Sequence, residues 1–195
     1  MKEDIIQAAA YLRQGRLIVY PTDTLYALGA DVFNDEAIRA VFTVKQRPLS
    51  VPLPVAVTSY KQMEEITLLT TTAKTLIDEF LPGELTLVVE KKPVLPDIVT
   101  GGAKTVAIRI PDDPIALELL KTFGPLTVTS ANIHTETTPY TIDEIKQSLP
   151  PKGIAFYIND GPRNGTPSTI VDCTKDPPKI LRAGSISSDA ILSKV

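Results

Sequence analysis

The chain has 195 residues, of which 43% are hydrophobic and 22% are charged. This length and composition are ordinary for one folded domain with a substantial core, and they argue against a disordered chain. No apolar run approaches the roughly 20 residues that a membrane-spanning helix needs, and the acidic start, Met1 to Asp4, is unlike a signal peptide. We therefore expect a single domain over residues 1–195, located in the cytoplasm.

The net charge of -3 argues against broad, nonspecific binding of nucleic acid, which depends on an excess of Lys and Arg. Cys173 is the only cysteine, so an internal disulfide is excluded, and its apolar neighbours predict a buried thiol. His134 is the only histidine, which nearly excludes a histidine metal site or a Ser-His-Asp triad. Because it lies in a polar stretch, we interpret His134 as an exposed side chain without a role.

Hydrophobic periodicity predicts an interleaved series of helices and strands. Ile5 to Leu12 have helical spacing and Gly15 ends that helix, Asn34 is expected to cap a second helix, and Pro48 ends the second helix at or before Arg47. Further helices are predicted over 72–80, 115–120, 142–149 and 188–192, and strands over 17–20, 53–57, 85–90, 105–110, 126–128, 154–158, 169–173 and 179–181. This order predicts an α/β protein with a twisted, mixed open sheet and packed helices.

Two cations lie one residue apart at the end of the second predicted helix, in Lys45-Gln46-Arg47-Pro48. Such cations suit an anionic ligand, because they supply opposite charge and N–H donors. They also suit a helix C-terminus, where they offset the dipole while remaining solvated. These two residues alone do not decide between the two interpretations.

Arg109 lies within an apolar strand, where an unpaired guanidinium is costly. It must therefore lie on an exposed face or find an anion. One hypothesis gives it a structural partner such as Asp112 or Asp113. The hypothesis that we favour gives it the carboxylate of a small substrate, which a guanidinium binds with two parallel hydrogen bonds.

Short polar segments follow several predicted strands. Thr129 to Asn132 follow one strand and begin with hydroxyl groups, while Ser168 and Arg182 lie near two others. Each residue alone has an ordinary explanation, such as helix capping or surface solvation. Ligands of open α/β sheets often bind beyond strand ends, so a common site explains the whole set more simply. The usual nucleotide signatures, the P-loop and Gly-x-Gly-x-x-Gly, are absent, so any nucleotide is held in another way.

These segments occur in the order seen in the YrdC-like family, which the chain resembles from about Ile5 to Gly184. The resemblance rests on the following segments: 21–29, 45–48, 52–53, 81–87, 106–111, 129–132, 168–172 and 181–184. It implies a twisted α/β sheet with a concave, basic face. Larger members carry a C-terminal extension, and the chain resembles the single-domain form.

The resemblance also implies a nucleotidyltransferase activity. It is the synthesis of threonylcarbamoyl-AMP and pyrophosphate from L-threonine, bicarbonate or CO2, and ATP. A partner enzyme would then transfer the threonylcarbamoyl group to an adenosine of tRNA. Magnesium would accompany ATP, so no protein metal site is expected.

The site residues implied by the resemblance divide into two groups. Lys45 and Arg47 would be catalytic and contact the ATP phosphates, together with nucleotide-binding residues Thr105, Ser130, Asn132, Thr138 and Arg182. L-threonine would be bound by Thr22, Arg109 and Ser168, with Arg109 on its carboxylate.

Two alternatives remain open at this stage. One is a module of the same fold that binds double-stranded RNA or tRNA without this reaction. The other is a YciO-like paralogue that uses the same pocket for another small substrate. The first alternative predicts binding that weakens steeply with salt, because phosphate contacts release counterions.

Overall fold

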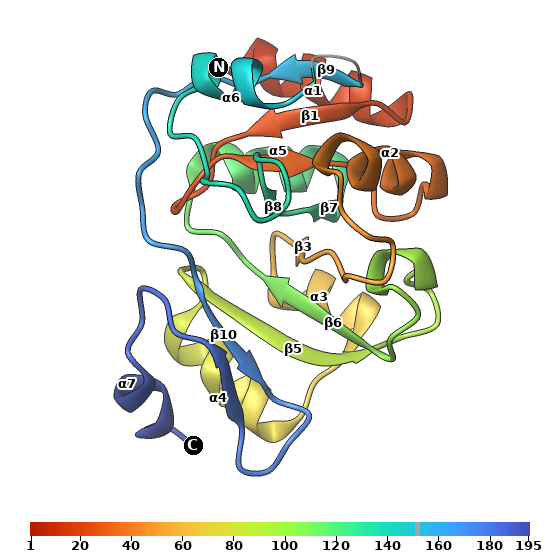
Figure 1. Cartoon of the computed structure of the whole chain (residues 1–195). Coiled ribbons are helices and arrows are strands. Elements are labelled where there is room, and N and C mark those ends of the chain that lie inside the picture. The colour runs from red at the N-terminus through yellow and green to blue at the C-terminus, as the bar shows by residue number, and fades with distance from the viewer. Residues whose placement is uncertain (151–152) are drawn as a thin grey trace.

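The computed structural model describes residues 1–150 and 153–195. Its strands form two open, mixed sheets, one above the other in Figure 1. The four-stranded sheet has the order β8 (Thr129–Ser130), β2 (Ala27–Gly29), β1 (Leu17–Tyr20) and β9 (Ile154–Tyr157). The second sheet has the order β11 (Lys179–Arg182), β10 (Thr169–Asp172), β5 (Leu85–Lys91), β6 (Thr105–Arg109), β3 (Val55–Ala56) and β7 (Leu126–Thr127), and β4 (Thr67–Leu68) pairs with β5.

Both sheets combine parallel and antiparallel pairs. In the first, β1 is parallel to β9 and antiparallel to β2. In the second, β10 is parallel to β5 and β3 is parallel to β6, whereas β5 and β6 are antiparallel. The predicted mixed α/β architecture is therefore confirmed, with its strands divided between two sheets.

Helices cover both sheets. The described helices are α1 (Lys2–Arg13), α2 (Asp35–Lys45), α3 (Tyr60–Ile66), α4 (Thr71–Phe80), α5 (Pro114–Phe123), α6 (Ile142–Ser148), α7 (Ser188–Leu192) and a 3-10 turn, η1 (Asp97–Thr100). Those described were predicted from the sequence except α3 and the turn η1. Side chains of α1 and α5, with Ile18 and Tyr20 of β1, form one apolar cluster. A larger cluster joins α2, α3 and α4 to the two sheets, and it includes Cys173, whose predicted burial is confirmed.

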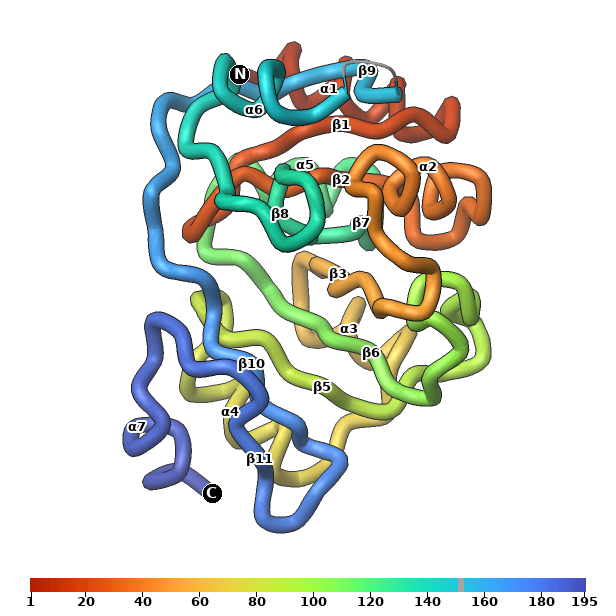
Figure 2. The backbone as a smooth tube through the Cα atoms, in the orientation of Figure 1, coloured from red at the N-terminus to blue at the C-terminus, as the bar shows by residue number. Residues whose placement is uncertain are grey.

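Besides the segment that runs from β2 through α2 to β3, two further segments connect the sheets. The chain passes directly from β7 to β8, and the Thr127 hydroxyl, fully buried there, donates to the carbonyl oxygen of Leu28 at 2.9 Å and accepts from the N–H of Ala30 at 3.0 Å. The second connection runs from β9 to β10 along one side of the molecule, as the blue segment of the trace in Figure 2 shows. The space between the sheets is therefore bounded by connections from several parts of the chain.

Helix α2 begins and ends as the sequence predicts. The Asn34 side chain accepts a hydrogen bond from the N–H of Ala37 at 3.0 Å, which satisfies one of the free donors of the first turn. Gln46 ends the helix in the left-handed conformation, with φ of 51°. The helix therefore ends between Lys45, its last residue, and Arg47, which follows the turn.

Within residues 1–150 and 153–195, no helix combines the length and the apolar character needed to cross a bilayer.

Candidate active site

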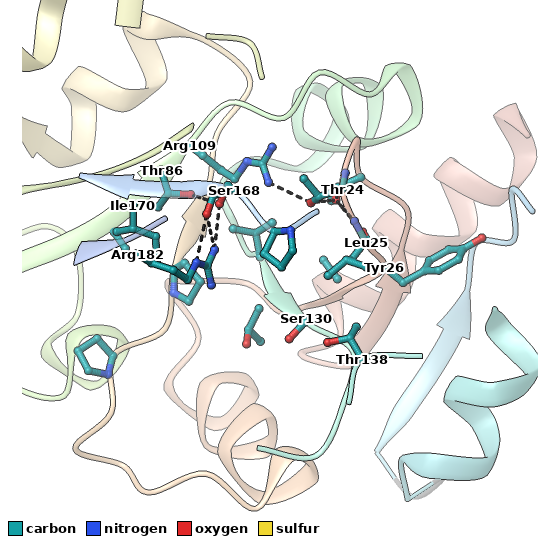
Figure 3. A pocket seen from close by; sticks show the side chains of 18 of the residues that line it. Thr24, Leu25, Tyr26, Thr86, Arg109, Ser130, Thr138, Ser168, Ile170 and Arg182 are labelled. Carbon is teal, nitrogen blue, oxygen red and sulfur yellow. Dashed lines mark hydrogen bonds between the residues drawn. The ribbon is translucent and has the colours of Figure 1, made fainter. Parts of the chain in front are cut away.

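A cavity of about 340 Å³ lies between the two sheets (Figure 3). Its wall comes from both sheets and from the loop that follows β1. Its polar lining consists of hydroxyl groups and three arginines, with no Asp or Glu among the described lining residues: Thr22, Thr24, Arg47, Thr86, Arg109, Thr129, Ser130, Thr138, Ser168 and Arg182. Positive charge with hydroxyl donors and no competing carboxylate suits an anionic ligand.

Arg109 ends β6 at the cavity wall and is only 4% exposed. Its Nη2 lies 2.7 Å from each carboxylate oxygen of Asp23 and 2.7 Å from the carbonyl oxygen of Gly83. Its Nη1 is 3.3 Å from the hydroxyl of Thr24. The structural partner is therefore Asp23, and the hypothesis of Asp112 or Asp113 is wrong, because the loop after β1 folds over the end of β6.

The loop that carries Asp23 is shaped by Thr22. The buried Thr22 hydroxyl donates to the carbonyl oxygen of Leu25 at 2.6 Å, and it accepts from the N–H groups of Leu25 and Thr24 at 3.2 and 3.3 Å. Thr22 also lines the cavity. It therefore holds the loop in a tight turn and presents that turn to a ligand.

Ser168 and Arg182 lie together on the wall formed by the second sheet (Figure 3). Nε and Nη2 of Arg182 donate to the carbonyl oxygen of Ser168 at 3.1 and 2.7 Å, and Nη2 is 3.2 Å from the Ser168 hydroxyl. Burial, followed by the nearby charge of Arg109, lowers the pKa of Arg182. Arg182 thus lies beside Ser168 and Arg109, which the resemblance assigned to threonine.

Lys45 is fully buried behind the cavity wall and does not line it. Its ammonium donates to the carbonyl oxygens of Ser130 and Asn132 at 2.5 and 2.6 Å, and to Oδ1 of Asn132 at 3.1 Å. Burial lowers the pKa of Lys45 to about 7, and the charge of Arg47 adds to this effect. In this conformation all three ammonium donors hold the segment that carries Ser130, so Lys45 shapes the wall from behind.

Asn132 completes this arrangement. Its Oδ1 also accepts from the hydroxyl of Ser130 at 2.6 Å, and its amide nitrogen donates to the carbonyl oxygen of Glu136 at 2.6 Å. Asn132 therefore ties the turn after β8 to Lys45 instead of capping a helix. Helix α6 is capped by Thr141 instead.

Arg47 lines the cavity from the turn after α2. Its Nε and Nη2 donate to the carbonyl oxygens of Val51 and Pro52 at 3.1 and 2.6 Å, and Nη1 is 3.3 Å from Nδ1 of His134. His134 is partly buried, and its pKa is lowered by burial and by the charges of Arg47 and Lys45. The predicted exposure of His134 is therefore wrong, since the folded turn places its ring against Arg47, whereas its lack of a role stays a prediction.

The remaining predicted residues divide between the cavity and its surroundings. Ser130 and Thr138 line the wall opposite Ser168 (Figure 3). Thr105 begins β6 and lies outside the lining, because four residues of extended strand place it about 13 Å from Arg109 at the other end. The cavity thus gathers Thr22, Arg47, Arg109, Ser130, Thr138, Ser168 and Arg182, while Lys45 and Asn132 support it and Thr105 does not contribute.

Sequence reasoning missed three residues of the site: Asp23, Thr24 and Thr86. Asp23 and Thr24 belong to the segment 21–29, in which only Thr22 received a role. Their signal was the cluster of short polar side chains directly after a buried strand. Thr86 gave a weaker signal, as one hydroxyl between Leu85 and Leu87 in an apolar strand.

Comparison with known proteins gives the family of this chain. A family model named for Sua5, YciO and YrdC, and described as telomere recombination, matches residues 10–184. The chain belongs to the Sua5/YciO/YrdC family. A threonylcarbamoyl-AMP synthase of Bacillus subtilis is 39% identical over 191 residues, covering 96% of this chain and 55% of that protein. A threonylcarbamoyl-AMP synthase of Pyrococcus abyssi is 36% identical over 187 residues, covering 94% of this chain and 55% of that protein.

Solved structures of the family have the same fold. P. abyssi Sua5 complexed with L-threonine matches with a TM-score of 0.94 and 34% identity, over all of this chain and 58% of that chain. Escherichia coli YciO matches with a TM-score of 0.89 and 27% identity, over 98% and 94% of the two chains. This member of the family thus spans little more than half the length of the two synthases and of Sua5, and nearly all of YciO.

The Lys45–Asn132 contact gives a prediction about stability. Lys45→Met and Asn132→Ala should each lower the free energy of unfolding by about 1–3 kcal/mol, because each leaves buried polar atoms without partners. The double variant should lose less than the sum, by roughly 0.5–3 kcal/mol, because both changes remove the same contact. Urea denaturation of the wild type, the two single variants and the double variant measures these free energies of unfolding. Strictly additive losses would show that the two side chains do not interact.

Proposed function

We propose that this chain synthesises threonylcarbamoyl-AMP from L-threonine, bicarbonate or CO2, and ATP, with release of pyrophosphate. The observation that carries the proposal is the cavity in which Arg47, Arg109 and Arg182 face a common space with several hydroxyl groups and no carboxylate. Bicarbonate, ATP, the carbamate, the product and pyrophosphate are anionic, and threonine is a zwitterion that carries a carboxylate. The names of the relatives support the same reaction for this member of the family.

The reaction has two bond-forming steps. The amine of threonine first condenses with bicarbonate, which gives a carbamate and water. An oxygen of the carbamate then attacks the α-phosphorus of ATP, and the bond from that phosphorus to the oxygen leading to the β-phosphate breaks. Pyrophosphate leaves with the electron pair of that bond. The product is a mixed anhydride of the carbamate and AMP.

The geometry supports a division of the cavity between the two substrates. Ser168, Arg182 and Arg109 form one wall, which suits the carboxylate of threonine. Arg47 contacts His134, in the segment between Ser130 and Thr138, and from there it would offset the charge of the triphosphate. Cations on both sides reduce the repulsion between carbamate and α-phosphate, and fixed walls supply the alignment that the attack needs.

Magnesium would be held by the phosphates of ATP, where it would offset their negative charge. The described lining residues offer hydroxyl oxygens and no carboxylate, and the described chain contains no group of three or more metal-binding His, Cys, Asp or Glu residues. These residues therefore fit an ion that arrives with the nucleotide. The anhydride product would pass to a partner that transfers the threonylcarbamoyl group to tRNA, a role that would place this chain in the cytoplasm.

The test is pyrophosphate release from ATP, Mg2+ and bicarbonate with one amino acid at a time. We expect release that requires both bicarbonate and L-threonine, and little release with L-serine or L-valine. Release with a different amino acid would indicate the substrate of a paralogue. No release with any amino acid, together with salt-sensitive binding of double-stranded RNA, would contradict the proposal in favour of an RNA-binding role.

Arg47, in the turn after α2, should matter far more than Arg39, which lies within α2. Arg47→Ala should lower kcat/KM for ATP by about 100-fold, as expected for loss of a group that stabilises developing charge. Arg39→Ala is the matched control, because Arg39 is exposed on α2 outside this cavity, and we expect a change within about twofold. Equal losses of kcat/KM in the two variants would show that overall positive charge, and not the position of Arg47, supports the reaction. No loss in either variant would contradict the role of Arg47.

A further inference from the structure

Thr86 lies in the cavity wall beside Ser168, and the functions discussed above give it no role. It is 3% exposed, and its hydroxyl oxygen is 2.8 Å from that of Ser168, which is 6% exposed (Figure 3). The position follows from the strand pattern, because Leu85 and Leu87 on either side are fully buried in the core. Alternation along β5 therefore turns Thr86 to the opposite face, toward the cavity.

The register of the sheet brings the two hydroxyls together. Strand β10 is parallel to β5, with Ile170 opposite Thr86. Ser168 precedes Ile170 by two residues and therefore faces the same side of the sheet. Ile170 and Ser168 both line the cavity with Thr86. The hydroxyl pair thus belongs to the cavity wall and not to the apolar core.

Counting donors and acceptors shows which way these hydrogen bonds run. A hydroxyl has one proton to donate and two lone pairs to accept with, whereas a guanidinium only donates. Because Nη2 of Arg182 approaches the Ser168 oxygen at 3.2 Å, that oxygen accepts from Arg182. Ser168 is also the hydrogen-bond partner of the Thr86 side chain among the described residues. If Thr86 donates to Ser168, the Ser168 oxygen accepts twice and its own proton is available to the cavity.

The reverse arrangement is less favourable when an anion is bound. If Ser168 donated to Thr86, its proton would point into the wall, and its oxygen would turn a lone pair toward the ligand. A carboxylate between Arg109 and Arg182 would be repelled by that lone pair and would gain no hydrogen bond from Ser168. A hydroxyl that accepts two hydrogen bonds is also the stronger donor, because chained hydrogen bonds polarise one another.

We propose that Thr86 is a positioning residue that donates to Ser168 and thereby directs the Ser168 proton toward the carboxylate of the amino-acid substrate. This inference rests on the proposed function, since it needs a carboxylate in this half of the cavity. It makes the Thr86 hydroxyl a determinant of affinity for the amino acid, with no direct part in binding ATP. It also gives the site a means of selecting an amino acid with a free carboxylate over its amide.

The test compares Thr86→Val with Thr86→Ser. Valine keeps the shape and loses the donor, whereas serine keeps the donor and loses a methyl group. We expect Thr86→Val to raise KM for L-threonine about 10-fold, the effect of a weakened hydrogen bond to a charged group. Its kcat and its KM for ATP should stay within about twofold of the wild type. The Thr86→Ser protein should have a KM for threonine close to that of the wild type.

Calorimetry with L-threonine and L-threoninamide gives a second readout that a merely structural role would not change. The amide carbonyl also accepts a hydrogen bond, but a weaker one than a carboxylate does, so Thr86→Val should weaken binding of threonine clearly more than binding of threoninamide. Equal loss for both ligands would overturn the inference, as would a normal KM in Thr86→Val or a failure of Thr86→Ser to restore it.

Failure of this inference can be separated from failure of the proposed function. A wild-type protein that releases pyrophosphate with threonine, alongside a Thr86→Val protein that is unchanged, refutes only the role of Thr86. A wild-type protein that shows no threonine-dependent release refutes the proposed function, and the role of Thr86 with it. Thermal melting of both variants shows whether a variant with an altered KM is still folded.

Discussion

The site depends above all on the ion pair between Arg109 and Asp23. The pair joins the loop after β1, in one sheet, to the end of β6 in the other, with a distance of 2.7 Å and side chains 5% and 10% exposed. Loss of either partner would leave the other charge buried and unpaired, so a change that breaks the pair should disturb this loop at the strand end. The cavity lies between these two elements, and its shape therefore follows from where that pair forms.

The charges around the cavity are arranged in two layers. Arg47, Arg109 and Arg182 line the space, whereas Lys45 lies behind Ser130 and holds the opposite wall in shape. Asp23 pairs with one nitrogen of the Arg109 guanidinium. None of the ion pairs among the described residues includes Arg182. Free positive charge thus remains for a ligand, as an enzyme that brings a carbamate to a triphosphate would require.

Most local features of the chain were predictable from the sequence, although helix α3 was missed, and long-range contacts were not predictable. The strand 17–20 and the capping of α2 by Asn34 follow from neighbouring residues, and both are confirmed. The short strand β2 was missed because its pairing with β1 and β8 is not encoded locally. Asp23 was missed as the partner of Arg109 because 86 positions separate them, and the burial of Lys45 depends on a turn 85 or more positions further along.

The most direct test of this account is a crystal structure of the chain with L-threonine and a non-hydrolysable ATP analogue. We expect the carboxylate of threonine within hydrogen-bonding distance of the Ser168 hydroxyl and of a guanidinium of Arg109 or Arg182, with the Arg109–Asp23 pair intact and the phosphates beside Arg47. Threonine bound outside this cavity, or an Arg109 side chain that leaves Asp23 and turns to solvent, would contradict the account.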